Sequence, residues 1–227
     1  MIKEPFLDDL ASPEPNPGGG AAAAYSACLG LALLEKVIRL ELNRPNLSPE
    51  LAAVWDDLLE HSDVVGDILR RLIHDDGRAY LDFAEARADG AEDVISGALG
   101  RVISVPILIM EESCQGLGLI SEAGKHCKRY LLSDLLVAGE FFLAAVQGAY
   151  HIARANICLI PNDPSQGRPQ VKFKDKIDRQ QNCCQDAYDM VQEELRLRIR
   201  SGAKAPGGGT KELSQNSPPS MGGVRGG

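Results

Sequence analysis

The feature that most constrains the fold is a proline- and glycine-rich turn that runs directly into an apolar segment of small residues, Pro15 to Ala24. Small residues remain frequent as far as Ala32, and side chains of this size let neighbouring helices approach closely. Asn43-Arg-Pro-Asn then supplies a helix stop. The sequence therefore predicts a long, buried helix over about residues 18–42.

Composition and periodicity favour an all-α fold. Leucine and alanine dominate, aromatic residues make up only 5% of the chain, and no alternating strand pattern of useful length occurs. Further helices are predicted over residues 6–10, from the N-cap Ser48 to 72, and over 93–110, 117–123, 133–156 and 175–200. We expect Asp75-Asp76-Gly77 to interrupt or bend one long helix and Pro106 to kink or restart another. The helical domain would span residues 1–200, followed by a Gly/Pro/Ser-rich disordered tail over 201–227.

Charge and cysteine content limit the classes of partner. A net charge of −8 argues against a nucleic-acid partner. The apolar segment 21–34 is too short to cross a membrane and 131–150 carries polar residues, so we expect buried helices and no membrane partner. The six cysteines form no C-x-x-C pair, and the charged N-terminus does not resemble a secretory leader. We therefore expect reduced, mostly buried thiols in a cytoplasmic protein without a metal site, with adjacent Cys183 and Cys184 either incidental or reactive.

The glycine triplet Gly18, Gly19 and Gly20 has two interpretations. A bare backbone at a helix N-terminus presents unpaired N–H groups and partial positive charge, which suits an anionic ligand. The same residues would also serve as a plain turn that packs closely against another backbone. The triplet alone does not decide between them, so other residues have to.

Four motifs follow one another in a fixed order. They are Phe6-Leu-Asp-Asp-Leu-Ala-Ser with the glycine turn, then Asp75-Asp76-Gly-Arg-Ala-Tyr80, Val105-Pro106 and Ser133-Asp134-Leu-Leu-Val-Ala138. This ordered set resembles the cyclodeaminase/cyclohydrolase family, which includes methenyltetrahydrofolate cyclohydrolases and the cyclodeaminase half of formiminotransferase-cyclodeaminase. The resemblance implies a bundle of long antiparallel helices, a homodimer and a folate substrate, with no metal or redox cofactor.

The resemblance also implies a reaction. The enzyme would hydrolyse 5,10-methenyltetrahydrofolate to 10-formyltetrahydrofolate, or form the methenyl compound from 5-formiminotetrahydrofolate with release of ammonia. The chain departs from the family pattern where Arg39 replaces an asparagine, Cys127-Lys128 replace Gly-Asn, and Ile152 replaces the first asparagine of a pair whose second member is Asn156. A different substrate on the same scaffold, or a non-catalytic binding protein, therefore remain alternatives.

Three carboxylates are the candidate catalytic groups. Asp75 and Asp76 would share a cleft at a helix break, where one would hold a proton; alternatively they are a helix cap and a solvated acid. Asp134 lies in an otherwise apolar helix, where a bare carboxylate is costly. It is either a site carboxylate with Ser133 as hydrogen-bond partner, or part of an N-cap or an ion pair with residues 128–129.

The candidate substrate-binding residues come from the glycine turn and from several segments far apart in the sequence. Arg39 and Lys128 would hold the glutamate carboxylates of folate or form ordinary salt bridges. Tyr80 would pack against the pterin or belong to the core, and His151 would act as an acid–base group or pack on the helix. The full set is Gly18, Gly19, Gly20, Arg39, Tyr80, Lys128, Ser133, His151 and Asn156.

Overall fold

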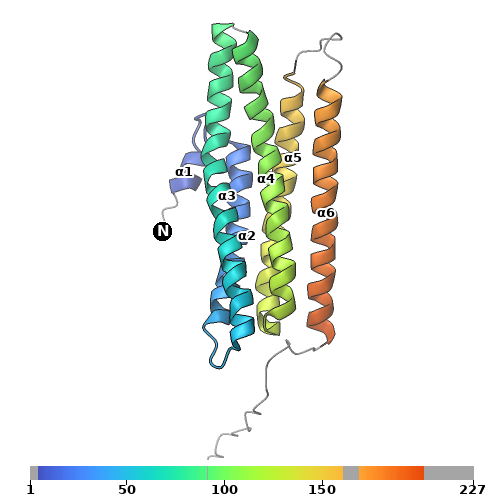
Figure 1. Cartoon of the computed structure of the whole chain (residues 1–227). Helices are drawn as coiled ribbons and strands as arrows, with labels where there is room; N and C mark the ends of the chain where they lie inside the picture. Colours follow the sequence, from blue (N-terminus) through green and yellow to red (C-terminus); the bar gives the residue numbers. More distant parts are fainter. Residues whose placement is uncertain (1–4, 91, 161–168, 202–227) are drawn as a thin grey trace, which may run out of the picture.

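The structure is a computed structural model that describes residues 5–90, 92–160 and 169–201. These residues form only helices and no strand, which confirms the all-α prediction (Figure 1). The elements are α1 (Pro5–Leu10), α2 (Gly19–Leu42), α3 (Pro49–Asp89), α4 (Glu92–His126), the 3-10 helix η1 (Arg129–Leu131), α5 (Leu132–Ile157) and α6 (Pro169–Ser201). The predicted tail beyond Ser201 lies outside the described residues, as does the predicted loop 162–167.

Helices α2 to α6 lie alongside one another in a bundle, and successive helices run in opposite directions (Figure 1). Helix α2 packs against α3, α4 and α5, while α6 lies on the seam between α4 and α5. The short helix α1 is held against α2 by the stacked rings of Phe6 and Tyr25, whose centroids are 4.3 Å apart. Because α2 begins part-way along the bundle, α3, α4 and α5 extend past its N-terminus.

The small residues of α2 allow it to sit deep in the bundle, as the sequence predicted. Ala21, Ala24 and Ala27 are fully buried. At Gly30, an added Cβ would lie 2.8 Å from the carbonyl oxygen of Ala138, so the backbones of α2 and α5 meet at a separation that only glycine permits. Leucine and isoleucine side chains of the same helix then fill the centre of the core.

The predicted interruption at Asp75-Asp76-Gly77 and the predicted restart at Pro106 are wrong, whereas the alternatives of a bend and a kink stay predictions. Helix α3 continues through Asp75-Asp76-Gly77, and α4 contains Pro106 in its interior. Both regions carry buried side chains on their inner faces, and burial of those side chains outweighs the local cost of glycine or proline in a helix. The predicted start of α3 is confirmed, because the Ser48 hydroxyl accepts the Leu51 N–H at 3.3 Å. Helix α6 starts earlier than predicted, at Pro169.

Three segments of the bundle are long and apolar enough to cross a membrane by length and composition alone: α2, α4 and Arg129–Ile157. Inside the bundle, 56%, 50% and 44% of their most apolar windows are buried, so much of their apolar surface faces outward.

The cysteines are all free but less buried than predicted. Cys127 and Cys184 are buried, two others are partly buried, and Cys158 and Cys183 are exposed.

Candidate functional site

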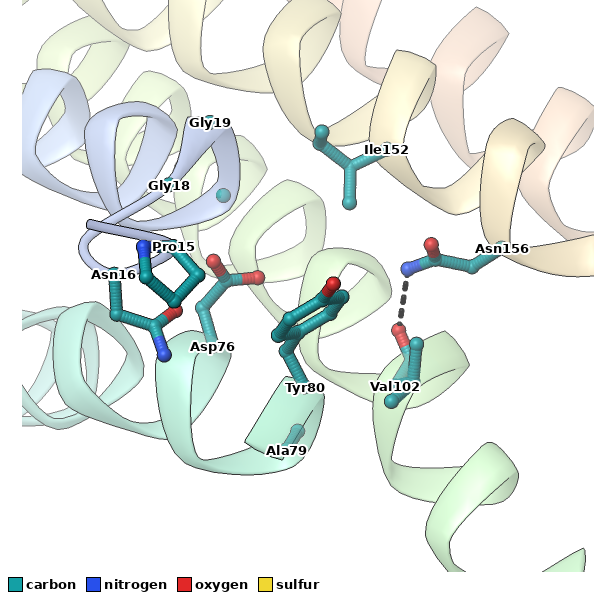
Figure 2. A pocket seen from close by; sticks show the side chains of 11 residues that line it. Pro15, Asn16, Gly18, Gly19, Asp76, Ala79, Tyr80, Val102, Ile152 and Asn156 are labelled. Atoms are coloured by element: carbon teal, nitrogen blue, oxygen red, sulfur yellow. Dashed lines mark hydrogen bonds between the residues drawn. The ribbon is translucent and has the colours of Figure 1, made fainter. Parts of the chain in front are cut away.

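A cavity of about 340 Å³ lies beyond the N-terminus of α2, where α3, α4 and α5 extend past it. The glycine turn supplies one wall, α3 the floor, and α4 and α5 the opposite wall (Figure 2). The lining residues are Pro15, Asn16, Gly18, Gly19, Gly20, Asp76, Ala79, Tyr80, Val102, Ile152 and Asn156. Residues that are far apart in the sequence therefore converge at one end of a helix.

Asp76 is the carboxylate of this cavity. Its side chain points from α3 toward the start of α2, where Oδ2 accepts the backbone N–H of Ala21 at 3.1 Å (Figure 2). An added Cβ at Gly20 would lie 2.7 Å from Oδ2 and closer still to Oδ1, so the carboxylate occupies the space that a side chain would take. Burial raises the pKa of Asp76 above its ordinary value, while the Ala21 N–H acts in the opposite direction.

The glycine turn is docked onto α3 beside this carboxylate. Asn16 donates its Nδ2–H to the carbonyl oxygen of Gly77 at 3.3 Å. A Cβ on Gly77 would lie 3.0 Å from Asn16 Oδ1, so glycine at this position provides close approach rather than a helix break. The contact fixes the turn relative to Asp76, one residue earlier on the same helix.

The opposite wall combines an amide with apolar groups. Asn156 donates its Nδ2–H to the carbonyl oxygen of Val102 at 2.8 Å, which orients the amide oxygen away from α4 (Figure 2). Ile152 approaches the glycine turn, since a Cβ on Gly19 would lie 3.2 Å from its Cδ1. The Tyr80 ring stands between Asp76 and Asn156 and is 53% exposed, so it offers an aromatic face at the mouth of the cavity.

The chemistry of the lining is that of a site for a flat cation. Among the described lining residues, Asp76 is the only charged group, and the rest are apolar, amide, glycine or aromatic. A carboxylate that has lost part of its hydration interacts more strongly with a cation than one in water does. No group of metal-ligating side chains occurs in the ranges that the structure describes.

Asp75 does not share this cavity, which corrects the prediction of a carboxylate pair. Consecutive residues of an α-helix point about 100° apart. Because α3 is unbroken here, Asp75 is exposed to solvent while Asp76 points inward. A proton shared between the two carboxylates is therefore not supported by the geometry.

Asp134 lies in a different part of the bundle. Its Oδ2 accepts a hydrogen bond from Lys36 Nζ at 2.8 Å, and its side chain is 32% exposed. Lys36 follows Gly20 by sixteen residues on α2, which corresponds to about 24 Å along the helix axis. Asp134 is thus neither bare nor buried, and Ser133 donates its hydroxyl to the Tyr130 carbonyl oxygen at 3.4 Å rather than to Asp134.

The predicted cations are also away from the cavity. Arg39 pairs with Glu35 at 2.7 Å on the outside of α2. Lys128 lies at the same end of the bundle, where its backbone N–H donates to Glu41 Oε1 at 2.7 Å. His151 is exposed and makes an edge contact with Tyr150. The roles predicted for these residues remain predictions that this cavity does not support.

The structure therefore brings together one part of the predicted set: the three glycines, Asp76, Tyr80 and Asn156. Sequence analysis missed the roles of Asn16, Ala79 and Val102. Asn16 lies inside the Pro-Asn-Pro motif and could have been included on that signal. Val102 contributes a backbone carbonyl, which no side-chain pattern reveals.

Comparisons with known proteins agree with one another. The sequence profile of the formiminotransferase-cyclodeaminase family matches residues 2–169. A methenyltetrahydrofolate cyclohydrolase from Methylorubrum extorquens is 34% identical over 122 residues, a match that covers 54% of this chain and 50% of the relative's length. The chain thus spans about half of that relative. This chain also superposes on the crystal structure of a formiminotetrahydrofolate cyclodeaminase from Thermotoga maritima, with a TM-score of 0.76 at 19% identity. The match covers 88% of this chain and 98% of that one, so the two share the same fold.

Proposed function

Because the chain belongs to the formiminotransferase-cyclodeaminase family, we propose that it hydrolyses 5,10-methenyltetrahydrofolate to 10-formyltetrahydrofolate in the cavity beyond α2. The observation that carries this proposal is the part-buried Asp76 carboxylate, fixed by the Ala21 N–H in a lining that contains no other charged residue among those described. The Methylorubrum relative, a methenyltetrahydrofolate cyclohydrolase, supports this direction of the reaction.

The substrate explains why a lone carboxylate is useful. The methenyl bridge carries a positive charge that is spread over its two nitrogens and the carbon between them. Asp76 would lie against this cation and stabilise it, and the exclusion of water around the carboxylate would strengthen the attraction. The Tyr80 ring offers a face on which the flat pterin can pack, and Asn156 offers an amide oxygen as an acceptor for a ring N–H.

Hydrolysis then needs both protons of one water molecule to be moved. Water attacks the bridging carbon, and Asp76 accepts one proton from that water as the C–O bond forms. The remaining hydroxyl of the adduct loses its proton to solvent as the carbonyl forms, the bond between N5 and the carbon breaks, N5 takes the proton held by Asp76, and the formyl group stays on N10. A pKa raised by burial makes Asp76 a stronger base than an ordinary aspartate and lets it carry the proton between the two steps.

The cyclodeaminase reaction is the second candidate, and the same observation favours it. In that direction N10 attacks the formimino carbon on N5 and passes its own proton to the formimino nitrogen, which takes one further proton and leaves as ammonia, so that the methenyl cation forms. An Asp76 carboxyl with a raised pKa would donate that proton.

A different small-molecule substrate, or binding without catalysis, would be supported by a ligand other than folate that stabilises the protein against heat.

The near-ultraviolet absorbance of 5,10-methenyltetrahydrofolate provides the test. We expect the full chain to accelerate the fall in absorbance above the spontaneous rate, and Asp76→Asn to abolish the acceleration with an unchanged circular dichroism spectrum. Ammonia release from 5-formiminotetrahydrofolate, measured on the same two proteins, distinguishes the second candidate. Absence of both activities in the wild-type chain would refute the proposal.

We also propose that the protein is a homodimer. Exposed apolar residues occur within about two turns of the Lys36–Asp134 pair, at Leu29 and Leu40 of α2, Tyr130 of η1 and Val137 of α5. A second copy would cover this face, and light scattering coupled to size exclusion tests the assignment.

A cytoplasmic location and the lack of nucleic-acid or membrane partners stay predictions.

A further inference from the structure

Three cysteines meet on the seam between α4 and α6, at residues that do not line the cavity of the proposed reaction. Cys114 lies on α4, and the adjacent pair Cys183 and Cys184 lies on α6. The buried Cys184 thiol donates to the Met110 carbonyl oxygen at 3.5 Å, which places it over the turn of α4 that leads to Cys114. Gln180 Nε2 donates to the same sulfur at 3.6 Å and holds it there.

The three thiols interact directly with one another. The neighbouring thiols of Cys184 and Cys183 lower the pKa of Cys114 to about 7 against the opposing effect of burial. Proximity to Cys114 and burial raise the pKa of Cys184. A lowered pKa favours the thiolate of Cys114, and the thiolate is the reactive form of cysteine.

The cluster is open to small molecules from solvent. Cys183 is exposed and lines a surface groove of about 430 Å³ together with Lys176, Arg179 and Gln180. Cys114 is partly buried and interacts with Cys183, the member of the cluster that lines this groove. Lys176 Nζ lies 3.7 Å from Glu111 Oε1 on α4, so an ion pair bridges the same seam about one turn before Cys114.

We propose that Cys114 and Cys183 are an oxidisable thiol pair that forms a disulfide between α4 and α6 when a peroxide reaches the groove. The Cys114 thiolate attacks one oxygen of hydrogen peroxide, the O–O bond breaks, and the released hydroxide takes up a proton to leave as water. Cys114 is then a sulfenic acid. The Cys183 thiol attacks this sulfur, the S–O bond breaks, and the second oxygen leaves as water, so that the peroxide is reduced and two thiols are oxidised.

This site is separate from the folate cavity. Cys114 follows the cavity residue Val102 by twelve positions on α4, or about 18 Å along the helix axis. The proposal consequently stands without the proposed function, and its test needs no folate.

The experiment measures the mass of the full chain under non-reducing conditions after treatment with hydrogen peroxide. We expect the wild-type chain to lose two hydrogens, to regain them with dithiothreitol, and to yield one cross-linked peptide pair that joins the Cys114 peptide to the Cys183–Cys184 peptide. Cys158→Ser removes an exposed cysteine outside the cluster and should form the same disulfide.

Two variants assign the partners. Cys183→Ser should form no disulfide and should instead gain oxygen on Cys114, and Cys114→Ser should neither cross-link nor gain oxygen within the cluster. Cys183 is exposed, so its replacement leaves the core intact. A wild-type chain that keeps its mass, or a Cys183→Ser chain that still links Cys114 to Cys184, would overturn the proposal.

Discussion

Gly20 tests whether the position of the Asp76 carboxylate determines activity. In Gly20→Ala, the new Cβ would lie 2.7 Å from Asp76 Oδ2, whereas ordinary van der Waals contact begins at 3.4 Å. Because Oδ1 lies closer still, the carboxylate must move by more than about 1 Å, and a misplacement of about 1 Å already reduces catalytic rates by about a hundredfold. Gly118→Ala is the matched control, because Gly118 lies inside α4, does not line the cavity, and would have nothing within 4 Å of its added Cβ.

The effect on stability is expected to be small. Movement of the carboxylate removes the hydrogen bond from the Ala21 N–H, which contributes about 1.5–3 kcal/mol when the acceptor is charged. Alanine in place of glycine inside a helix returns up to about 1 kcal/mol. The difference predicts a net loss of about 0.5–2 kcal/mol in the free energy of unfolding. In Gly118→Ala, the same gain in helix propensity of up to about 1 kcal/mol is unopposed, because an added Cβ meets no neighbour.

The assay follows the loss of 5,10-methenyltetrahydrofolate absorbance and compares kcat/KM for the wild-type chain and the two alanine variants. Thermal melts of the same preparations show whether each variant is folded. We expect Gly20→Ala to lose about a hundredfold in kcat/KM while Gly118→Ala stays close to wild type. Equal activity of the two variants would refute the reasoning, since the carboxylate would then act elsewhere or not at all.

Three further predictions follow from individual contacts. Asp76→Asn should become more stable relative to the wild-type chain as the pH rises above 3.8. The reason is that folding raises the pKa of Asp76, so an ionised, part-buried carboxylate destabilises only the wild type. A difference in melting temperature between the two proteins that stays constant from acid to neutral pH would contradict this. Asp134→Asn breaks a half-exposed ion pair and should cost less than about 1 kcal/mol with unchanged folate activity; a large loss of kcat in a folded variant would restore the catalytic role predicted from the sequence. Ser48→Ala removes the N-cap of α3 and should lower the free energy of unfolding by about 1 kcal/mol in denaturant titrations, and an unchanged midpoint would show that the cap does not contribute.

The helices were largely predictable from the sequence. Apolar residues at helical spacing, the Ser48 cap and the stop after Leu42 are local signals. Helices α2 and α5 begin and end within about one residue of the predicted bounds, and α3 begins where predicted. Most of the predicted site residues that line the cavity belong to two contiguous motifs, the glycine turn and the Asp75–Tyr80 segment. Members of one short stretch of chain stay close together in the folded protein, so these motifs were informative.

Tertiary structure decided which polar residues share a site. The unbroken α3 sends Asp76 into the cavity and Asp75 into solvent, since helix geometry fixes the angle between neighbours once packing has overridden the glycine. The docking of Asn16 on Gly77 and the bond from Asn156 to Val102 join residues more than fifty positions apart. Asp134 is far from Asp76 because α2, which both helices contact, is long enough to separate them. Local sequence sets helix propensity and face, whereas the distance between two faces depends on how the whole bundle buries its apolar surface.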